Sequence, residues 1–520
     1  MTGPTPVRAI LAAALALLIS LTAPALAQSS DPTPDSTADL APDAVVAAFL
    51  AARADGYAWV EENEVPTLNA KGAAVVRVLE RAERQGLRPA DYTLPAADSP
   101  ESLDQAVSRT LLRYLTDLQA GRVAPKKVDP ELFVFPRDVD GLALLDAVHA
   151  APETAKAMAD LAPGNPIYRR LRRLLLDYRA LARSGGWHPV PEGPTLKPGM
   201  TDPRVSEVRR RLSSTADLTP ASGATDLYDP ALESAVRQFQ RRHGLDADGA
   251  IGAKTVAAMN VPVRDRIRQI VLNMERFRWM PDEFGDDHVF VNMAGFELDY
   301  VVGGVTRLAM RVIVGRPYRE TPIFSDTIRY LEFNPTWSVP AKIAAQDLLP
   351  KIKKDPSYLT AGGYELYAGY QDGAPRVDPA SVDWAAIPKG RFPYRLRQAP
   401  GEKNALGQVK FMFPNQFDVY LHDTPARELF AKSVRNFSSG CIRLQKPITL
   451  AEVMLAADGQ DPTQVRKILD GKKTTRVNLK TPVPVHLTYL TAWIGEGGTV
   501  EFRDDIYGRD SLLANALGLI

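Results

Sequence analysis

The spacing of apolar residues changes along this chain, and that change limits the folds it can adopt. Between about residues 41 and 184, apolar residues such as Leu171, Leu174 and Tyr178 recur three and four positions apart, which is typical of one helix face. Beyond Asp287, short runs rich in β-branched residues are separated by glycines, which is typical of strands. We therefore expect a multidomain α+β protein with a helical amino-terminal part and a mainly β later part. The length of 520 residues fits about three or four domains.

The charges of the chain nearly cancel. Its 63 Lys and Arg residues against 62 Asp and Glu residues leave a formal net charge of +1. This balance excludes a general electrostatic affinity for nucleic acid or an anionic membrane, so no nucleic-acid partner is expected. The histidines show no metal-ligand spacing and no H-E-x-x-H motif. We therefore expect neither a metal nor another cofactor.

The first 27 residues have the organisation of a secretory signal peptide. Arg8 supplies a positive charge, Ile10–Leu21 is an apolar run shorter than the ~20 residues of a spanning helix, and residues 25–27 form an A-x-A cleavage site. Cleavage after Ala27 would leave a mature chain with no other stretch apolar enough to cross a bilayer, and an uncleaved anchor is the alternative. Residues 28–40, rich in Ser, Thr, Asp and Pro, are expected to form a flexible lead-in. The sequence therefore predicts an exported protein.

A compact segment at residues 196–262 contains two helical stripes and several glycines at turn positions. Its pattern resembles the small three-helix peptidoglycan-binding module, which implies contact with the cell wall. Such modules also serve as spacers, so binding by this one stays open. The residues that carry the resemblance are Gly199, Val205, Leu212, Phe239, Gln240, Gly244, Leu245, Asp248, Gly249, Gly252 and Thr255.

The chain contains one cysteine, Cys441, which cannot form an intramolecular disulfide. A lone thiol in an exported protein is a liability unless it has a task, so Cys441 is a candidate nucleophile. His422, 19 positions earlier, could accept the thiol proton and return a proton to a leaving group. Gly440 would let nearby backbone N–H groups bind an oxyanion, and Arg443 could hold a carboxylate. On spacing alone, a structural cysteine with an unrelated packing histidine stays an equal alternative.

The segment from Tyr420 to Leu444 resembles the catalytic motif of the L,D-transpeptidases, the YkuD-domain family. His422 matches the first histidine of that motif, Ser438 its hydroxyl position, and Gly440–Arg443 its nucleophile segment. Ser439 stands where the family has a second histidine, which leaves His422 as the only candidate base in the motif. This serine variant is similar to the larger, YcbB-like Gram-negative branch. Further segments similar to that branch are residues 273–279, 333–337, 397–401 and 503–508.

The resemblance implies a periplasmic acyltransferase with Cys441 as nucleophile and His422 as base. Cys441 would attack the third residue of a tetrapeptide stem and release D-Ala, and an amine of a second stem would then complete a 3–3 cross-link. The alternatives are a thiol hydrolase that cleaves wall cross-links and a wall-binding scaffold protein without activity. The implied partners are peptidoglycan stem peptides and other cell-wall synthases. The residues expected to bind substrate are Arg443, Ser439, Asn334, Trp337 and Tyr394, although Trp and Tyr also serve as core.

Taken together, the patterns and the resemblances divide the chain into consecutive segments. The helical part is expected to be a scaffold, and the β-rich part to carry catalysis. The segments are a signal peptide at 1–27, a lead-in at 28–40, a scaffold domain at 41–195, a peptidoglycan-binding-like domain at 196–262, a connecting helix at 263–286, a catalytic domain at 287–470 with a capping insertion at 340–395, and carboxy-terminal strands and tail at 471–520 packed on the scaffold and catalytic domains.

Overall fold

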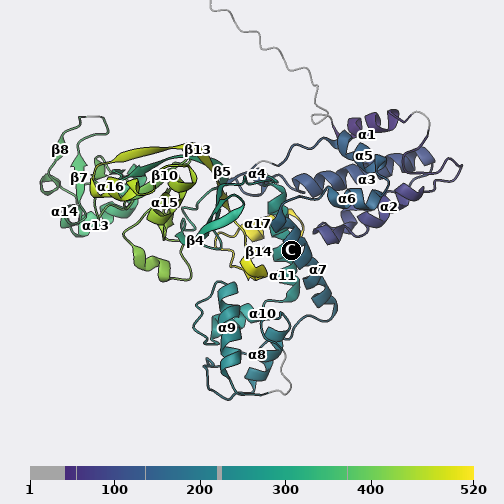
Figure 1. Cartoon of the computed structure of the whole chain (residues 1–520), viewed down its shortest axis with the longest axis horizontal. Coiled ribbons are helices and arrows are strands. Elements are labelled where there is room, and N and C mark those ends of the chain that lie inside the picture. The colour runs from purple at the N-terminus through teal and green to yellow at the C-terminus, as the bar shows by residue number, and fades with distance from the viewer. Residues whose placement is uncertain (1–40, 54–55, 135, 220–224, 372, 520) are drawn as a thin grey trace, which may run out of the picture.

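The structure is a computed structural model that describes residues 41–53, 56–134, 136–219, 225–371 and 373–519. The signal peptide and lead-in expected at residues 1–40 lie outside the described residues. Figure 1 shows a helical part at one end, a β-rich part at the other and a small helical unit that projects below them. The fold class expected from the sequence is confirmed. None of the described helices has the length and apolar character needed to cross a membrane.

The first part is a bundle of helices around a core that includes Trp59, Leu115 and Leu145. Its longest helix starts at a capping box, in which the side chains of Ser99 and Ser102 each accept a hydrogen bond from the other residue's backbone N–H. The helices are α1 (Pro42–Ala51), α2 (Ala70–Leu79), η2 (Ala82–Gln85), η3 (Pro89–Tyr92), α3 (Pro100–Ala120), α4 (Pro125–Val128), α5 (Gly141–Ala150) and α6 (Thr154–Asp160).

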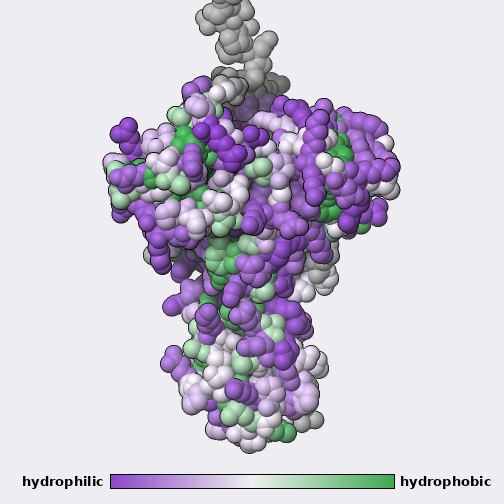
Figure 2. Space-filling view, turned by 90° about the vertical axis from the view of Figure 1, so that its left-hand side faces the viewer, coloured by the Kyte–Doolittle hydropathy of each residue, from purple (hydrophilic) through white to green (hydrophobic). Residues whose placement is uncertain are grey.

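Two long helices, α7 (Pro166–Arg183) and α11 (Val263–Arg278), pack against each other at the centre of the molecule. Their shared core includes Leu175 and Met274, and the hairpin of β14 (Ala492–Ile494) and β15 (Val500–Phe502) packs on it. The small unit below them has its own core, which includes Val208 and Phe239. Figure 2 shows this unit set off from the rest by a narrower waist. Its helices are α8 (Arg204–Ser213), α9 (Pro230–Arg242) and α10 (Ala253–Asn260).

The β-rich part is a nine-stranded sheet with the order β1-β5-β10-β11-β12-β4-β3-β2-β13. The long strand β13 pairs with β2 in parallel and with β5 in antiparallel orientation, so the sheet closes on itself. Helix α15 (Pro447–Ala457) and helix α16 (Gln464–Asp470) precede β13, and helix α17 (Arg509–Ala516) follows the β14–β15 hairpin. The strands are β1 (Leu132–Phe133), β2 (His288–Asn292), β3 (Glu297–Val302), β4 (Val305–Ile313), β5 (Ile323–Phe333), β10 (Val409–Met412), β11 (Leu421–His422), β12 (Ile442–Leu444) and β13 (Thr475–Thr488).

Between β5 and β10 the chain forms a separate small unit at the outer end of the β-rich part. A four-stranded sheet with the order β6-β9-β7-β8 and several short helices enclose a core that includes Leu366 and Trp384. This unit coincides with the segment expected to be an insertion. Its elements are β6 (Trp337–Ser338), α12 (Ala341–Ile343), η4 (Ala344–Leu348), α13 (Leu349–Lys354), α14 (Ser357–Ala361), β7 (Tyr364–Tyr367), β8 (Arg376–Val377), η5 (Pro379–Ser381) and β9 (Arg395–Gln398).

Candidate active site

The pairing of β11 with β12 determines which side chains meet at the candidate site. The two strands run parallel, with Leu421 opposite Ile442 and His422 opposite Arg443. Leu421 and Ile442 are fully buried in the sheet's core. Because side chains alternate between the two faces of a strand, His422, Arg443 and Cys441 lie on the other face. His422 and Cys441 are 19 positions apart in the sequence, and the strand pairing thus makes them neighbours in the sheet.

These side chains line a cavity of about 520 Å³ between the sheet and the insertion. Polar groups from the β4–β5 loop and the insertion complete its wall, and Trp337 from β6 lies there as the sequence predicted. The residues that line it are Arg316, Tyr318, Arg319, Glu320, Trp337, Pro340, Lys342, Ile343, Asp347, Leu348, Lys351, Ala405, Leu406, Phe417, Asp418, Tyr420, His422, Ser438, Ser439, Cys441 and Arg443.

Cys441 is partly exposed to this cavity. Its Sγ lies 3.7 Å from the carbonyl oxygen of Asp418, to which the thiol donates, and the Tyr420 side chain lies beside it. The surrounding protein atoms desolvate the thiol and raise its pKa to about 11, although Tyr420 and the Arg443 charge act in the opposite direction. The ligand-free protein therefore holds a neutral thiol at neutral pH.

His422 is buried, and its ring orientation is fixed by the backbone. Its Nδ1 lies 2.5 Å from the carbonyl oxygen of Asp423, so the proton belongs on Nδ1 and Nε2 is left as an acceptor. Burial and the neighbouring charges of Arg443 and Lys410 lower the pKa of His422 to about 3. The Asp423 carboxylate instead accepts hydrogen bonds from the backbone N–H groups of Gln408 and Thr424. A carbonyl, not that carboxylate, therefore orients the imidazole.

Cys441 and His422 share the cavity without touching. Within the described part of the chain, no hydrogen bond joins the thiol to the imidazole, and the thiol's acceptor is Asp418. Catalytic hydrogen bonds are often long in ligand-free sites and tighten when substrate binds. With the thiol and the imidazole both neutral, the ligand-free site holds no resting thiolate–imidazolium ion pair.

The raised thiol pKa has a direct consequence for alkylation of the ligand-free protein. The thiolate is the reactive form, and burial disfavours it, so the rate of alkylation by iodoacetamide should rise about tenfold per pH unit between pH 7 and 10. The rate is measured by intact mass, and Cys441 is the only cysteine in the chain. A rate that is already constant from pH 7 upward would show a low-pKa thiolate and contradict this expectation.

Gly440 places the backbone of the nucleophile segment close to the β4–β5 loop. Its φ of 118° lies in the region that favours glycine. Its N–H donates to the Ser438 hydroxyl, and its carbonyl accepts from the Thr321 hydroxyl at 2.7 Å. Among the described residues, the N–H of Cys441 has no hydrogen-bond acceptor. That N–H is therefore free to bind an oxyanion formed next to the sulfur.

Arg443 brings a positive charge into the cavity. No carboxylate of the described residues forms an ion pair with it, and its Nε is buried without a hydrogen-bond partner. An unpaired guanidinium with a planar set of donors is suited to bind a carboxylate of a ligand. The carboxylate-binding role expected for Arg443 from the sequence stays a prediction.

Ser439 lines the cavity, and its hydroxyl accepts a hydrogen bond from the Arg319 guanidinium at 2.9 Å. The same guanidinium forms a bidentate ion pair with Asp347 of η4, with distances of 2.5 and 3.0 Å. Arg319 therefore connects the insertion to the residue before Gly440. Arg319 could not be predicted from the sequence, because no motif includes it.

Two residues expected to bind substrate lie elsewhere. The Asn334 amide donates to the carbonyl of Ile468 at 2.9 Å, and the Asn334 carbonyl accepts from Thr474, so this residue braces the end of β5 against the segment before β13. Tyr394 packs against Trp384 in the core of the insertion. Neither residue is among those that line the cavity, and their role in substrate binding stays a prediction. No cluster of His, Cys, Asp and Glu suited to a metal ion occurs among the described residues.

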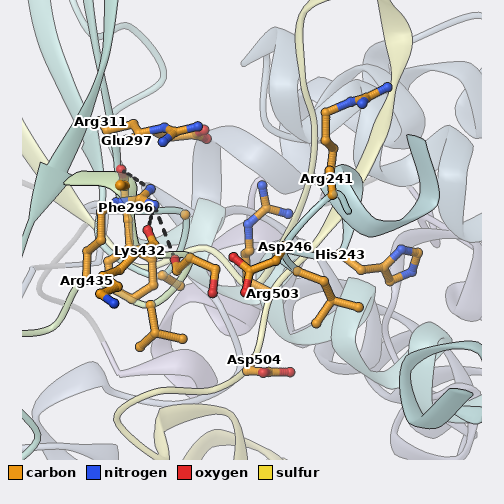
Figure 3. Close-up of a pocket in the computed structure, with 18 of the residues that line it drawn as sticks. Arg241, His243, Asp246, Phe296, Glu297, Arg311, Lys432, Arg435, Arg503 and Asp504 are labelled. Carbon is orange, nitrogen blue, oxygen red and sulfur yellow. Dashed lines mark hydrogen bonds between the residues drawn. The ribbon is translucent and has the colours of Figure 1, made fainter. Parts of the chain in front are cut away.

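A second cavity, of about 770 Å³, lies between the three-helix unit and strands β3 and β4 of the sheet (Figure 3). Two of its arginines are used in hydrogen bonds to backbone carbonyls, and one of these bonds joins the two units. The Arg435 guanidinium donates to the carbonyls of Phe296, Val312 and Lys432, and Arg503 donates to the carbonyl of Arg242 at the end of α9. This cavity contains no thiol and lies apart from Cys441.

Comparison with known proteins matches three segments of the chain to protein families. Residues 286–485 match the family model of the YkuD L,D-transpeptidase catalytic domain, residues 44–175 a "Scaffold domain", and residues 201–259 a "Putative peptidoglycan binding domain". A curated protein of Haemophilus influenzae called "Putative L,D-transpeptidase" is 40% identical over 243 residues, which are 47% of this chain and 48% of that protein. The chain thus matches about half the length of this relative.

Solved structures were also compared. An L,D-transpeptidase from Stackebrandtia nassauensis is 14% identical, covers 60% of this chain and 100% of its own, and has a TM-score of 0.22. An L,D-transpeptidase from Mycobacterium smegmatis is 12% identical, covers 39% of this chain and 58% of its own, and has a TM-score of 0.19. From the family models, the chain carries a YkuD L,D-transpeptidase catalytic domain and a peptidoglycan-binding domain.

Proposed function

We propose that this chain, which carries a YkuD catalytic domain next to a peptidoglycan-binding domain, is an L,D-transpeptidase that forms 3–3 cross-links in peptidoglycan. The observation that supports this most is the content of the cavity beside the insertion. It brings together the chain's single thiol, an imidazole with Nε2 free and an unpaired guanidinium. A nucleophile, a base and a carboxylate-binding group are the groups that acyl transfer on a peptide stem requires.

In the first half of the reaction, Cys441 Sγ attacks the carbonyl carbon of the third stem residue. The thiol proton passes to Nε2 of His422 as the carbon–sulfur bond forms. The oxyanion is bound by the N–H of Cys441. When the tetrahedral intermediate breaks down, the carbon–nitrogen bond is cleaved, His422 returns the proton to the departing amine, and D-Ala leaves. The product is a thioester on Cys441.

In the second half, the side-chain amine of another stem attacks the thioester. His422 takes a proton from the amine and returns it to the sulfur as the carbon–sulfur bond breaks. The new amide is the cross-link, and the free thiol is regenerated. Arg443 is placed to bind a carboxylate of a stem, and the insertion, linked through Arg319 and Asp347, is placed to cover the donor.

This activity implies an exported protein that works where peptidoglycan stems are accessible, which is the periplasm in the Gram-negative branch that the sequence resembles. The signal peptide at residues 1–27, with cleavage after Ala27, fits that location. We include other cell-wall synthases among the partners, because cross-linking acts on strands that they provide.

Product analysis tests the proposal. The purified chain is incubated with disaccharide-tetrapeptide stems, and the products are separated and identified by mass. We expect 3–3 dimers together with one D-Ala for each cross-link. Tripeptide without dimers would show that water replaces the second stem as acceptor, and unchanged tetrapeptide with no adduct on the protein would overturn the proposal.

A further inference from the structure

The peptide unit between Gly440 and Cys441 is held from outside the catalytic motif. The hydroxyl of Thr321 donates to the Gly440 carbonyl at 2.7 Å, and Thr321 is fully buried. A peptide unit is planar and trans, so fixing the direction of the Gly440 carbonyl also fixes the direction of the Cys441 N–H at its other end. The Thr321 hydroxyl therefore sets where the candidate oxyanion donor points.

Thr321 is itself held by the turn between β4 and β5. Its hydroxyl accepts from the N–H of Gly315 at 3.0 Å, and the Gly315 carbonyl accepts from the hydroxyl of Tyr507 at 2.7 Å. The neighbours of Gly315 pair directly with the nucleophile segment, since Ser438 donates to the Val314 carbonyl at 2.9 Å and accepts from Arg316. The Tyr507 hydroxyl thus fixes the Gly315–Arg316 peptide group, whose N–H donates to Ser438. Thr321 and Ser438 both bind the preceding Val314–Gly315 peptide group, so the three contacts together hold the turn.

Tyr507 belongs to the carboxy-terminal segment and is anchored strongly. Its ring stacks on Tyr489 with 5.5 Å between centroids, and the Arg509 guanidinium lies 5.0 Å from its centroid. Arg509 in turn pairs with Glu320 at 2.7 Å and with Asp129 of the helical part at 3.0 Å. The carboxy-terminal segment therefore connects the helical part to the loop behind the nucleophile.

From these contacts we infer that Thr321 and Tyr507 are positioning residues, which align the Cys441 N–H for oxyanion binding through the Gly440 carbonyl and the Gly315 turn. This inference rests on the proposed acyl-transfer function. Neither residue touches the reacting atoms. Replacing either one should therefore lower the rate of the acyl-transfer step and leave substrate affinity and thiol reactivity unchanged.

The test compares two reactions of the same thiol in the full chain. Acylation by a tetrapeptide stem, followed as D-Ala release, forms an oxyanion, whereas alkylation by iodoacetamide does not. In Thr321→Val, which keeps the shape and removes the hydroxyl, we expect kcat for D-Ala release to fall by roughly tenfold to a hundredfold, which is less than the ~10²–10³-fold effect of removing an oxyanion donor because the Cys441 N–H itself remains. KM and the alkylation rate should stay unchanged. Thr321→Ser should restore most of kcat, and Tyr507→Phe should lower it in the same manner but less.

Thr488→Val is the matched control, because the buried Thr488 hydroxyl donates to the Val291 carbonyl at 2.9 Å in the same sheet and away from Cys441. It should leave both reactions unchanged. If Thr321→Val released D-Ala at the wild-type rate, or if its alkylation rate fell as far as its kcat, the inference would be overturned while the acyl-transfer function stood. If Thr321→Val failed to fold, the rates of D-Ala release and of alkylation in Thr321→Ser and Tyr507→Phe would test the inference in its place. If the wild-type chain released no D-Ala, the proposed function and this inference would fall together.

Discussion

Replacing Cys441 with alanine is expected to abolish covalent loading of the protein by a tetrapeptide stem and to lower cross-linking on the order of 10⁴-fold or more. The chain has no second thiol that could take over the attack. His422 and the Cys441 N–H would remain, but without a nucleophile they have no bond to form. Intact mass after incubation with donor stem measures this directly. The wild-type chain should gain one stem fragment, and Cys441→Ala should gain none.

His422→Gln is the informative companion, because it keeps the thiol and removes the base. With a thiol pKa of about 11 and no base, acylation should be slow at pH 7 and should rise with pH as more thiolate forms. The wild-type protein, in which His422 takes the proton during attack, should be fast at neutral pH. An adduct on Cys441→Ala would place the nucleophile on another residue, and a His422→Gln variant as fast as wild type at pH 7 would remove the imidazole from the mechanism.

The sequence was most informative where local pattern determines structure. Helical spacing predicted the amino-terminal helices, and the segment from Tyr420 to Leu444 predicted that His422 and Cys441 share a site. The two residues come close together because they lie on or next to the parallel strands β11 and β12, which are joined by the loop that contains η6 (Arg427–Ala431). The closure of the sheet by β13 was not predictable, because it depends on pairings between residues more than 140 positions apart, as between Thr475 and Phe333.

The residues of the candidate site also differ in how far the sequence could predict them. Arg443, within the motif, pairs with His422 across two strands and lines the same cavity as Cys441. Thr321 reaches Gly440 across 119 positions, and Arg319 reaches Ser439 across 120, so no spacing in a single sequence could identify them. Asn334 was expected to bind substrate, and that role stays a prediction. In the structure, its φ of 47° and its hydrogen bonds to the segment before β13 serve the turn after β5.

The buried ion pair between Glu275 and Arg278 at the end of α11 has the largest effect expected on stability. Both side chains are almost completely buried, at 1% and 0% exposure, with 2.6 Å between Glu275 Oε2 and Arg278 Nη1. Arg278 also donates to the carbonyls of Leu118 and Gln85 and to the hydroxyl of Tyr168, so it joins α3, η2 and α7 to α11. Glu275→Ala would leave this guanidinium buried without its counter-ion. We expect the free energy of unfolding to fall by about 3–5 kcal/mol, measured by urea titration of the transition that melts these helices.

Glu452→Ala is the matched control, because Glu452 on α15 pairs at 3.2 Å with Arg466, whose side chain is 73% exposed. An exposed pair of this kind contributes roughly 0–1 kcal/mol, so the control should shift the transition little. The double variant Glu275→Leu with Arg278→Met should recover much of the loss, since an apolar pair of similar volume removes the uncompensated charge. A Glu275→Ala protein as stable as Glu452→Ala would show that Arg278 is held by its carbonyl acceptors alone and that the charge pair does not hold the helices together.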